Sequence, residues 1–290
     1  MKISIAIAAV SVAAALASSR QVKTDETDVV CRSTESLRAK IAKSHKVVGE
    51  DLWYGYRRTK FDFGGREAWI VEPSVAAAKG MPWTWTMQWA EAFVDRTGIL
   101  DCLKKGYHHV TIDLFGTRMD EIGLEAAAAY QKFLVDELGF APKANLVGMS
   151  WGGFFSTRYA AAYPGNVRRI YLDAPLMNFD GFGGDAMKTP TAAAAKIGPW
   201  AGKQPKDGHW STDPRMPVNL SVPIAKAGIP VYLLYGGQDQ TVIPSLNCER
   251  FAKSFKAAGG EITVVKRDLF GHHPHGLDPD KTQPIVDFFR

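Results

Sequence analysis

The sequence predicts an α/β fold, with a mostly parallel sheet that carries helices on both faces. Short apolar segments rich in β-branched residues recur along the chain, and stretches with helical spacing of apolar residues separate them. Some of these segments are continuously apolar, as in 231–235 (VYLLY), which is typical of strands buried on both faces. This alternation favours parallel strands joined by helical crossovers.

Length and composition favour one domain over residues 20–290. The chain has 290 residues, 46% of them hydrophobic, which is enough for one large core. No repeat with a period of about 20–50 residues and no low-complexity linker divides the sequence. The formal net charge of +5 falls to +4 without residues 1–19, where Lys2 is the one charged residue. A charge this modest does not indicate a nucleic-acid partner.

The first 19 residues have the pattern of a secretory signal peptide. Lys2 precedes an apolar, alanine-rich stretch, and an Ala-Leu-Ala triplet at 15–17 stands before two serines. A transmembrane anchor is the alternative, but the apolar run is shorter than the ~20 residues that span a bilayer. We therefore expect a secreted or periplasmic protein without stable membrane insertion after cleavage.

The sheet is expected to start with strands at 52–63 and 68–72. Five further strands follow, at 108–114, 144–149, 167–172, 231–235 and 262–266. The clearest helix is 120–138, where apolar residues recur at helical spacing and Gly139 ends the pattern. A second helix, 152–163, ends at Pro164-Gly165, and residues 20–45 are polar and in part helical.

The strand at 144–149 leads directly into Gly-Met-Ser-Trp-Gly at 148–152. In a tight turn of this kind, positions 148 and 152 need glycine, because a side chain there would collide with the strand and the helix. Ser150 would then present its hydroxyl at the top of the sheet, which predicts a catalytic nucleophile. The alternative is a strand-to-helix turn that merely needs small residues.

An acid and a base follow the serine in chain order. Asp239 comes just after the strand at 231–235, and His272 follows Gly271 beyond the strand at 262–266. A serine hydroxyl needs an imidazole to take its proton and a carboxylate to fix the imidazole. Asp173, at the end of an earlier strand, is an alternative acid. We favour Asp239, because its loop leads toward the histidine strand.

Three histidines compete for the role of base. His272 is favoured because it leaves the strand first, whereas His273 should point away in an extended loop and His275 lies beyond the rigid Pro274. A zinc site in this cluster is an alternative. It is disfavoured because proline interrupts the cluster and no cysteine or Glu-x-x-His partner is near. We expect no metal and no organic cofactor.

The motifs LVGMSWGG, YGGQDQTVIP and GHHPHGL, in this order, resemble those of the α/β-hydrolases over roughly residues 45–290. The stretches WIVEPSVAAAKGMPWTW and NLSVPIAKAGIPVYLLYGGQD more narrowly resemble secreted bacterial hydrolases found with polysaccharide-degrading enzymes. The resemblance implies the α/β-hydrolase fold and a carbohydrate-linked ester as substrate. Those relatives usually carry an arginine where this chain has Thr86, so a substrate contact of that arginine cannot be transferred.

An acyl-transfer site also needs two donors for the oxyanion. One is expected to be the amide of Trp151, which follows the nucleophile, and the other an amide of the loop 73–85, for which we favour Trp85. Indole rings stack on sugars and also hold aryl or alkyl groups, although core packing is an equally good explanation for them. The expected substrate-binding residues beside the oxyanion hole are Trp83, Trp89 and Gln88.

Residues 176–228 are rich in glycine and proline and place Trp200 and Trp210 among polar residues. They fall where α/β-hydrolases insert a cap, which predicts a short lid, with an excursion without function as the alternative. Export permits one disulfide among three cysteines and leaves the pairing open. Those cysteines are Cys31, Cys102 and Cys248.

The sequence thus predicts a secreted serine esterase that works through an acyl-enzyme on small-molecule or glycan esters. A serine peptidase or another acyl transferase would use the same three residues. A non-catalytic binding module that keeps the fold is an alternative from a different class. The presence of Ser150, Asp239 and His272 together argues against the module.

Overall fold

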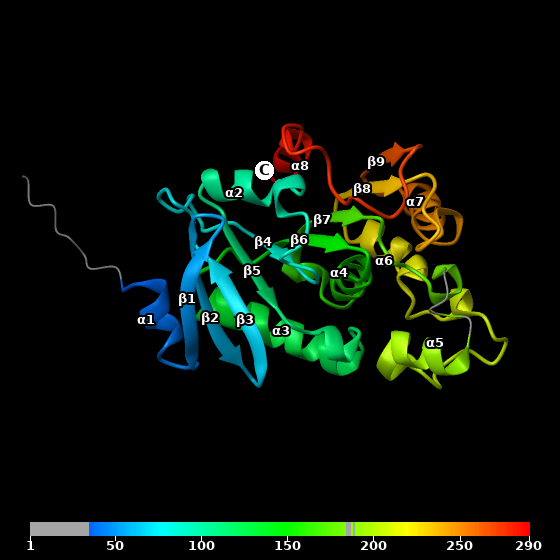
Figure 1. The fold of residues 1–290 in the computed structure, drawn as a ribbon, viewed down its shortest axis with the longest axis horizontal. Coiled ribbons are helices and arrows are strands. Elements are labelled where there is room, and N and C mark those ends of the chain that lie inside the picture. The colour runs from blue at the N-terminus through cyan, green and yellow to red at the C-terminus, as the bar shows by residue number, and fades with distance from the viewer. Residues whose placement is uncertain (1–34, 184–186, 188) are drawn as a thin grey trace, which may run out of the picture. The chain divides into compact units, whose positions relative to one another are not determined.

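The computed structural model describes residues 35–183, 187 and 189–290. The expected signal peptide and Cys31 lie outside the described residues. The compact unit Ser36–Arg290 is built on a nine-stranded sheet of order β1-β2-β3-β5-β4-β6-β7-β8-β9 (Figure 1). The strands are β1 Val47–Trp53, β2 Tyr56–Phe63, β3 Arg66–Val71, β4 Trp83–Thr86, β5 His108–Ile112, β6 Ala144–Met149, β7 Val167–Asp173, β8 Val231–Gly236 and β9 Ile262–Arg267.

Six strands run parallel, since β4 pairs in parallel with both β5 and β6, and β6 through β9 continue the same direction. Strands β1, β2 and β3 form an antiparallel extension on the β5 edge. The described helices are α1 Leu37–Ile41, α2 Ile99–Lys104, α3 Glu121–Asp136, α4 Trp151–Ala162, α5 Pro190–Ile197, α6 Ser221–Lys226, α7 Cys248–Ala257 and α8 Gln283–Phe289.

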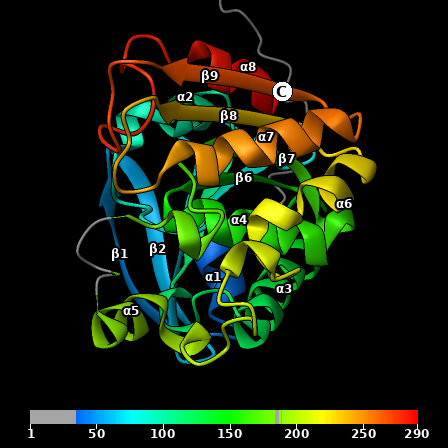
Figure 2. The ribbon, with the colours of Figure 1, turned by 90° about the vertical axis from the view of Figure 1, so that its right-hand side faces the viewer.

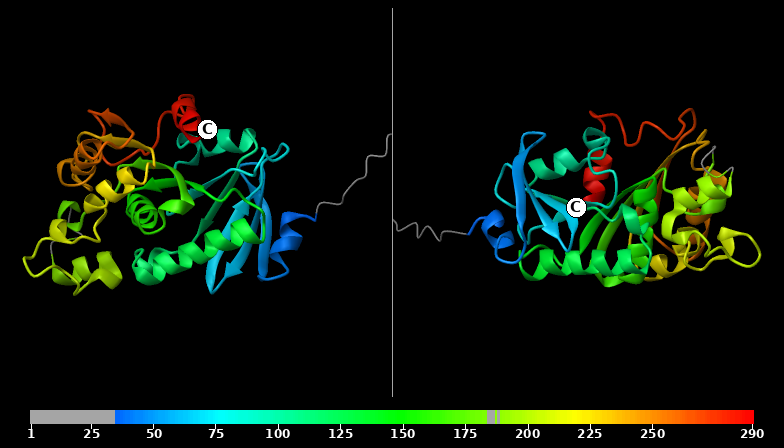
Figure 3. Two further views of the ribbon diagram at one scale, coloured as in Figure 1. Left: turned by 180° about the vertical axis from the view of Figure 1, so that it is seen from behind. Right: turned by 60° about the horizontal axis from the view of Figure 1, so that its bottom comes forward.

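The helices cover both faces of the sheet. On one face, α2 and α8 pack together with residues such as Tyr171 and Leu234 of the central strands (Figure 2). On the other face, α3, α4, α6 and α7 bury a larger cluster that includes Phe133 and Phe154 (Figure 3). The predicted fold class, a mostly parallel sheet with helices on both faces, is confirmed. None of the described helices has the length and apolar character needed to cross a membrane.

Two predicted strand boundaries were wrong. The expected single strand at 52–63 is the end of β1, a tight turn and β2, because Tyr54 and Gly55 both take positive φ angles of 50° and 83° and reverse the chain. Strand β4 lies partly inside the loop predicted at 73–85. Its four residues are buried and the strand pairs with β5 on one side and β6 on the other, so tertiary pairing rather than length or flanking composition makes it a strand.

The segment 176–228 is packed against the rest of the unit. Its residues Phe179, Trp200 and Trp210 are buried in the larger cluster. The buried Arg158 of α4 donates hydrogen bonds from Nε to the Met119 carbonyl (2.7 Å) and from Nη1 to the Arg215 carbonyl (2.8 Å).

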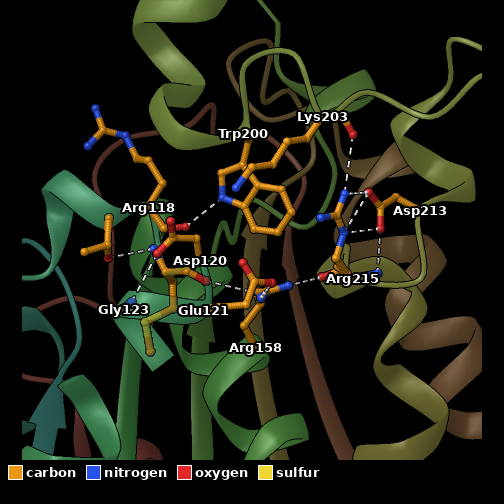
Figure 4. Close-up of polar contacts among 11 residues, drawn as sticks. Arg118, Asp120, Glu121, Gly123, Arg158, Trp200, Lys203, Asp213 and Arg215 are labelled. Carbon is orange, nitrogen blue, oxygen red and sulfur yellow. Dashed lines mark hydrogen bonds and ion pairs between the residues drawn. The ribbon is translucent and has the colours of Figure 1, made fainter. Parts of the chain in front are cut away.

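The Trp200 ring lies near the two hydrogen bonds of Arg158. It is 4.7 Å from the guanidinium of Arg158 and 5.0 Å from that of Arg215, and its indole N–H donates to the Arg118 carbonyl (Figure 4). These contacts join the segment to α4 and to the loop before α3 (Figure 4).

Candidate active site

Ser150 lies on the tight turn between β6 and α4, with φ 49° and ψ −115°. A Cβ added at Gly148 would stand 2.7 Å from the Gly152 carbonyl oxygen, and one at Gly153 would stand 2.2 Å from Pro175. At Gly152 the nearest atom, the Gln88 oxygen, is 3.3 Å away, so that position is tight but less strict than expected. Positions 148 and 153 are therefore the ones that require glycine.

The strained turn is held in place by its neighbours. The Ser150 amide donates to the carbonyl of Asp173 at the end of β7 (3.0 Å), and the Ser150 carbonyl accepts from the amides of Gly153 and Leu176 (both 2.9 Å). A positive φ outside glycine costs free energy and persists only where the surroundings fix it, as they do here. The serine hydroxyl is thereby presented above the carboxyl ends of the strands.

The three residues expected to act together lie within hydrogen-bond distance. His272 Nε2 is 3.1 Å from Ser150 Oγ, and His272 Nδ1 is 2.7 Å from Asp239 Oδ2. The other Asp239 oxygen accepts from the amides of Thr241 and Val242, both at 2.8 Å. An ionised carboxylate only accepts, so the hydrogen of the imidazole lies on Nδ1 and the lone pair on Nε2 faces the serine hydroxyl.

A second histidine–aspartate pair lies in the same loop. His275 Nδ1 is 2.8 Å from Asp173 Oδ1, and the other Asp173 oxygen accepts from the Tyr171 hydroxyl and the Gly276 amide. Asp173, the alternative acid, thus faces His275 rather than His272. Burial raises the pKa of Tyr171 well above its ordinary value, which keeps its hydroxyl protonated as a donor.

A cavity of about 270 Å³ opens above Ser150. His272, His273 and His275 form part of its wall, and Phe93 and Trp151 line it as well. Phe182 and Lys196, from the segment 176–228, also contribute to the wall. An adjoining cavity of about 400 Å³ is lined by Trp89, Gln88 and Glu91, among others, and Trp89 borders both cavities.

The expected oxyanion donors are placed differently from one another. Trp151 is the first residue of α4, and its amide has no hydrogen-bond partner among the described residues. Trp85 lies inside β4 between β5 and β6, so its amide belongs to the sheet and the prediction for it was wrong.

The Gln88 amide is the better candidate for the second donor. It stands 3.4 Å from where a Gly152 Cβ would be, and it has no partner in the described part of the chain. The Met87 amide, by contrast, donates to the Val147 carbonyl and is occupied.

The two predicted substrate-binding tryptophans, Trp83 and Trp89, are placed differently. Trp83 is fully buried and its indole N–H donates to the Ala141 carbonyl, so it belongs to the core, as does the fully buried Trp85 beside it. Trp89 is 41% exposed and Gln88 lines the adjoining cavity. Sequence reasoning missed Phe182 and Lys196, since no motif marks them beyond the unusual composition of their segment.

The cysteines in the described part do not form a disulfide with each other. Cys102 in α2 and Cys248 in α7 are buried free thiols. Burial raises the pKa of Cys102 to about 12 and raises that of Cys248 as well, so neither supplies a thiolate nucleophile. Within the described ranges, the one group of possible metal ligands is His272, His273 and His275.

Comparison with known proteins supports this architecture. A family model described as alpha/beta hydrolase fold matches residues 88–191, which include Ser150 but stop before Asp239 and His272. No curated protein shows significant sequence similarity to the chain.

Solved structures share the fold at low sequence identity. The dipeptidyl peptidase 4 of Porphyromonas gingivalis is 13% identical with a TM-score of 0.59, over 80% of this chain and 35% of that one. A puromycin-hydrolysing peptidase of Mycobacterium tuberculosis is 18% identical with a TM-score of 0.57, over 84% and 37% of the two chains. A sugar hydrolase from Lactococcus lactis is 13% identical with a TM-score of 0.53, over 74% and 84%.

This chain therefore spans little more than a third of those two peptidases. The matches and the sheet topology together establish that the chain has the α/β-hydrolase fold.

Proposed function

We propose that this protein is a serine hydrolase that cleaves carboxylic esters through an acyl-enzyme. The observation that carries the proposal is the continuous hydrogen-bond chain from Ser150 through His272 to Asp239. A serine in this arrangement loses its proton to the imidazole as it attacks, and the carboxylate stabilises the imidazolium that forms.

In the first half of the reaction, Ser150 Oγ bonds to the ester carbonyl carbon and its proton moves to His272 Nε2. The carbonyl oxygen becomes negative and accepts hydrogen bonds from the amides of Trp151 and Gln88. His272 then gives the proton to the leaving alcohol as the carbon–oxygen bond breaks. In the second half, His272 takes a proton from water, the hydroxide attacks the acyl group, and Ser150 is released with its proton restored.

The proposed substrate class is an ester on a polysaccharide or its fragments. Trp89 supports this choice, since an exposed indole at the border of both cavities offers a flat face on which a sugar ring can stack. The fold shared with a sugar hydrolase from Lactococcus lactis is in keeping with it. The small cavity above Ser150 would receive the acyl group, and the adjoining cavity the sugar.

The segment 176–228 is proposed to act as a lid over the acyl site. Phe182 and Lys196 support this role, because both line the cavity above Ser150 and both belong to that segment. Hydrogen bonds from Arg158 to the Arg215 carbonyl and from Trp200 to the Arg118 carbonyl hold the segment at these two positions. The amino-terminal pattern of Lys2 and the apolar stretch after it supports export to the periplasm or beyond.

A serine peptidase is the second candidate. The similarity in fold to a dipeptidyl peptidase and to a puromycin-hydrolysing peptidase favours it, since peptide bonds yield to the same triad. The two activities differ in the leaving group, which is an alcohol for an ester and an amine for a peptide.

The test compares an ester and an amide that carry the same acyl group. We expect the purified protein to hydrolyse p-nitrophenyl acetate and to leave intact the p-nitroanilide with the same acetyl group. We also expect it to hydrolyse acetylated xylo-oligosaccharides. Ser150→Ala is the control for background hydrolysis. Faster cleavage of the anilides than of the esters would assign the chain to the peptidases, and equal ester hydrolysis by Ser150→Ala would overturn the proposal.

A further inference from the structure

The mechanism above uses one histidine–aspartate pair and leaves a second pair without a role. His275 and Asp173 are both buried, with side chains 4% and 2% exposed, and their contact measures 2.8 Å. Burying an imidazole and a carboxylate costs free energy that their mutual contact only partly offsets. The pair also places an imidazole beside the catalytic one, since the His272 and His275 ring centroids are 4.9 Å apart.

A third imidazole completes the group. The His273 ring centroid lies 4.8 Å from that of His272 and 4.9 Å from that of His275. One ring nitrogen from each of the three residues lies within 4.8 Å of the others. A tetrahedral zinc ion with Zn–N bonds of about 2.05 Å needs ligand nitrogens about 3.4 Å apart. The rings therefore need to close by no more than about 1.4 Å, and His273 is exposed and can turn.

The hydrogen bonds around the group suit it to a metal. His272 and His275 each use Nδ1 on a carboxylate, which fixes the tautomer with the lone pair on Nε2. In His272 this lone pair faces the Ser150 hydroxyl, so an ion at Nε2 would replace that contact. A histidine that ligates a metal with one nitrogen and donates to a carboxylate with the other is the usual arrangement in zinc sites. The two buried carboxylates that contact these rings also attract a cation into the cavity, and they oppose the positive charge of Lys196, which lines the same cavity.

The loop that holds the rings is anchored on both sides. Arg96 donates to the His275 carbonyl (2.9 Å), and Arg267 donates to the Gly276 carbonyl (2.6 Å). The Gly276 amide in turn donates to Asp173. Ligands on an anchored loop need little reorganisation when an ion arrives, which raises affinity.

We propose that His272, His273 and His275 form an inhibitory site for a divalent transition-metal ion such as Zn²⁺. The three imidazoles supply three ligands, and water or the Ser150 oxygen supplies the fourth. Occupation of His272 Nε2 removes the lone pair that accepts the serine proton, so the bound ion stops acyl transfer. The inhibitory part of this inference rests on the proposed hydrolase function, whereas the metal site itself does not.

Binding is tested with the metal alone, on the full chain carrying Ser150→Ala, so that turnover plays no part. We expect isothermal titration with Zn²⁺ to show one site, and Co²⁺ to develop the intense visible bands of a tetrahedral nitrogen-ligated ion. His273→Ala and His275→Gln, each in the Ser150→Ala background, should weaken binding by more than the 10–100-fold typical of losing an outer-shell partner. His209→Ala, at an exposed histidine outside the group, should leave it unchanged.

Inhibition is then measured on the chain with Ser150 intact, relative to each variant's own rate without metal. Zn²⁺ should abolish ester hydrolysis reversibly, chelator should restore it, and His273→Ala should need at least about tenfold more metal. Circular dichroism checks the fold of His275→Gln. If His275→Gln does not fold, His273→Ala still tests the proposal, because His273 is exposed.

The outcomes separate the two proposals. Hydrolysis without one-site metal binding, or equal binding by His273→Ala and the parent, overturns the metal site and leaves the hydrolase. The opposite result is also informative. If the protein hydrolyses neither esters nor amides, but binds one metal ion and loses that binding in His273→Ala, the hydrolase proposal is overturned and the metal site is supported.

Discussion

The two histidine–aspartate pairs of this molecule have nearly the same chemistry and different positions. His272 meets Asp239 at 2.7 Å and His275 meets Asp173 at 2.8 Å, both through Nδ1. The carboxylates lie at the carboxyl ends of the neighbouring strands β8 and β7. Yet of the two imidazoles, His272 alone reaches Ser150. A histidine–aspartate pair therefore becomes a base through its position above the nucleophile turn, and not through its own contact.

The surroundings of the two carboxylates also differ. Asp239 is held by amides of its own loop, at Thr241 and Val242. Asp173 instead joins separate parts of the chain, since its side chain accepts from Gly276 and its carbonyl accepts from the Ser150 amide. The second pair thus ties the histidine loop to β7 and the nucleophile turn. We expect the first pair to govern rate and the second to govern stability and loop placement.

The largest expected difference between the pairs is in the two histidines. His272→Ala should lower kcat for an activated ester by about 10⁶-fold, the scale of losing a triad histidine. His275→Gln should lower it by less than about tenfold, because His275 makes no contact with Ser150. Steady-state kinetics on p-nitrophenyl acetate measures both. The comparison fails if His275→Gln is the more damaged of two folded variants.

The two acids should separate in the same direction with a smaller effect. Asp239→Asn should reduce kcat by about 10⁴-fold, because an amide no longer enforces the tautomer that accepts the serine proton. Asp173→Asn should change kcat by less than about tenfold. Steady-state kinetics of both variants at one pH measures the difference. If Asp173→Asn loses most of its activity and Asp239→Asn stays near the parent, the roles of the two pairs must be exchanged.

For stability, we expect the second pair to matter more than the first. Asp173→Asn leaves the buried His275 and the Gly276 amide without their charged acceptor, so we expect a loss of about 3–5 kcal/mol in the free energy of unfolding. Asp239→Asn should cost less, since the Thr241 and Val242 amides that it binds belong to its own loop and can bind water when that loop relaxes. Urea unfolding followed by tryptophan fluorescence measures both variants. A smaller loss for Asp173→Asn would show that the second pair does not hold the loop.

The smallest effect concerns acid sensitivity, which we assign to histidines without a carboxylate partner. Burial lowers the pKa of His108 to about 4 and that of His109 to about 3. Between about pH 6.5 and pH 4 the unfolded chain binds protons at these residues and the folded chain does not, so stability falls as pH falls. The full contribution is present above about pH 6.5.

His108→Phe removes one of these titrations. The free energy of unfolding of the parent should drop by about 2–3 kcal/mol more than that of His108→Phe between pH 7.5 and pH 4.5, since one pKa unit corresponds to about 1.4 kcal/mol. Urea unfolding at the two pH values checks it. His209→Ala, at an exposed histidine, serves as the control and should keep the slope of the parent. If the free energy of unfolding falls equally with pH in His108→Phe and in the parent, His108 does not contribute to the acid sensitivity.

The sequence allowed the parallel sheet and the nucleophile turn to be predicted, because both are local patterns. A buried strand, a glycine turn and a helix follow one another around Ser150, and Asp239 and His272 each come just after a strand. Residues fixed by tertiary pairing escaped prediction. Strand β4 forms because β5 and β6 flank it, and that pairing buries Trp83 and Trp85 away from the site.

The residues that line the cavity from the segment 176–228 could not be predicted from the sequence either. Phe182 and Lys196 reach it from a segment whose course depends on the anchor at Arg158 and Trp200. The choice between Asp239 and Asp173 also needed the three-dimensional structure. Asp173 is the last residue of β7 and Asp239 follows the adjacent β8, and both acids contact a histidine of the same loop.

The most direct measurement of the central claim is covalent capture of the nucleophile. A fluorophosphonate reacts with a serine only where a neighbouring base activates it. We expect mass spectrometry of the treated protein to show one adduct on the peptide that contains Ser150, absent from Ser150→Ala and strongly slowed in His272→Ala. An adduct on a different residue, or no adduct in a preparation that hydrolyses esters, would contradict the assignment of Ser150, His272 and Asp239.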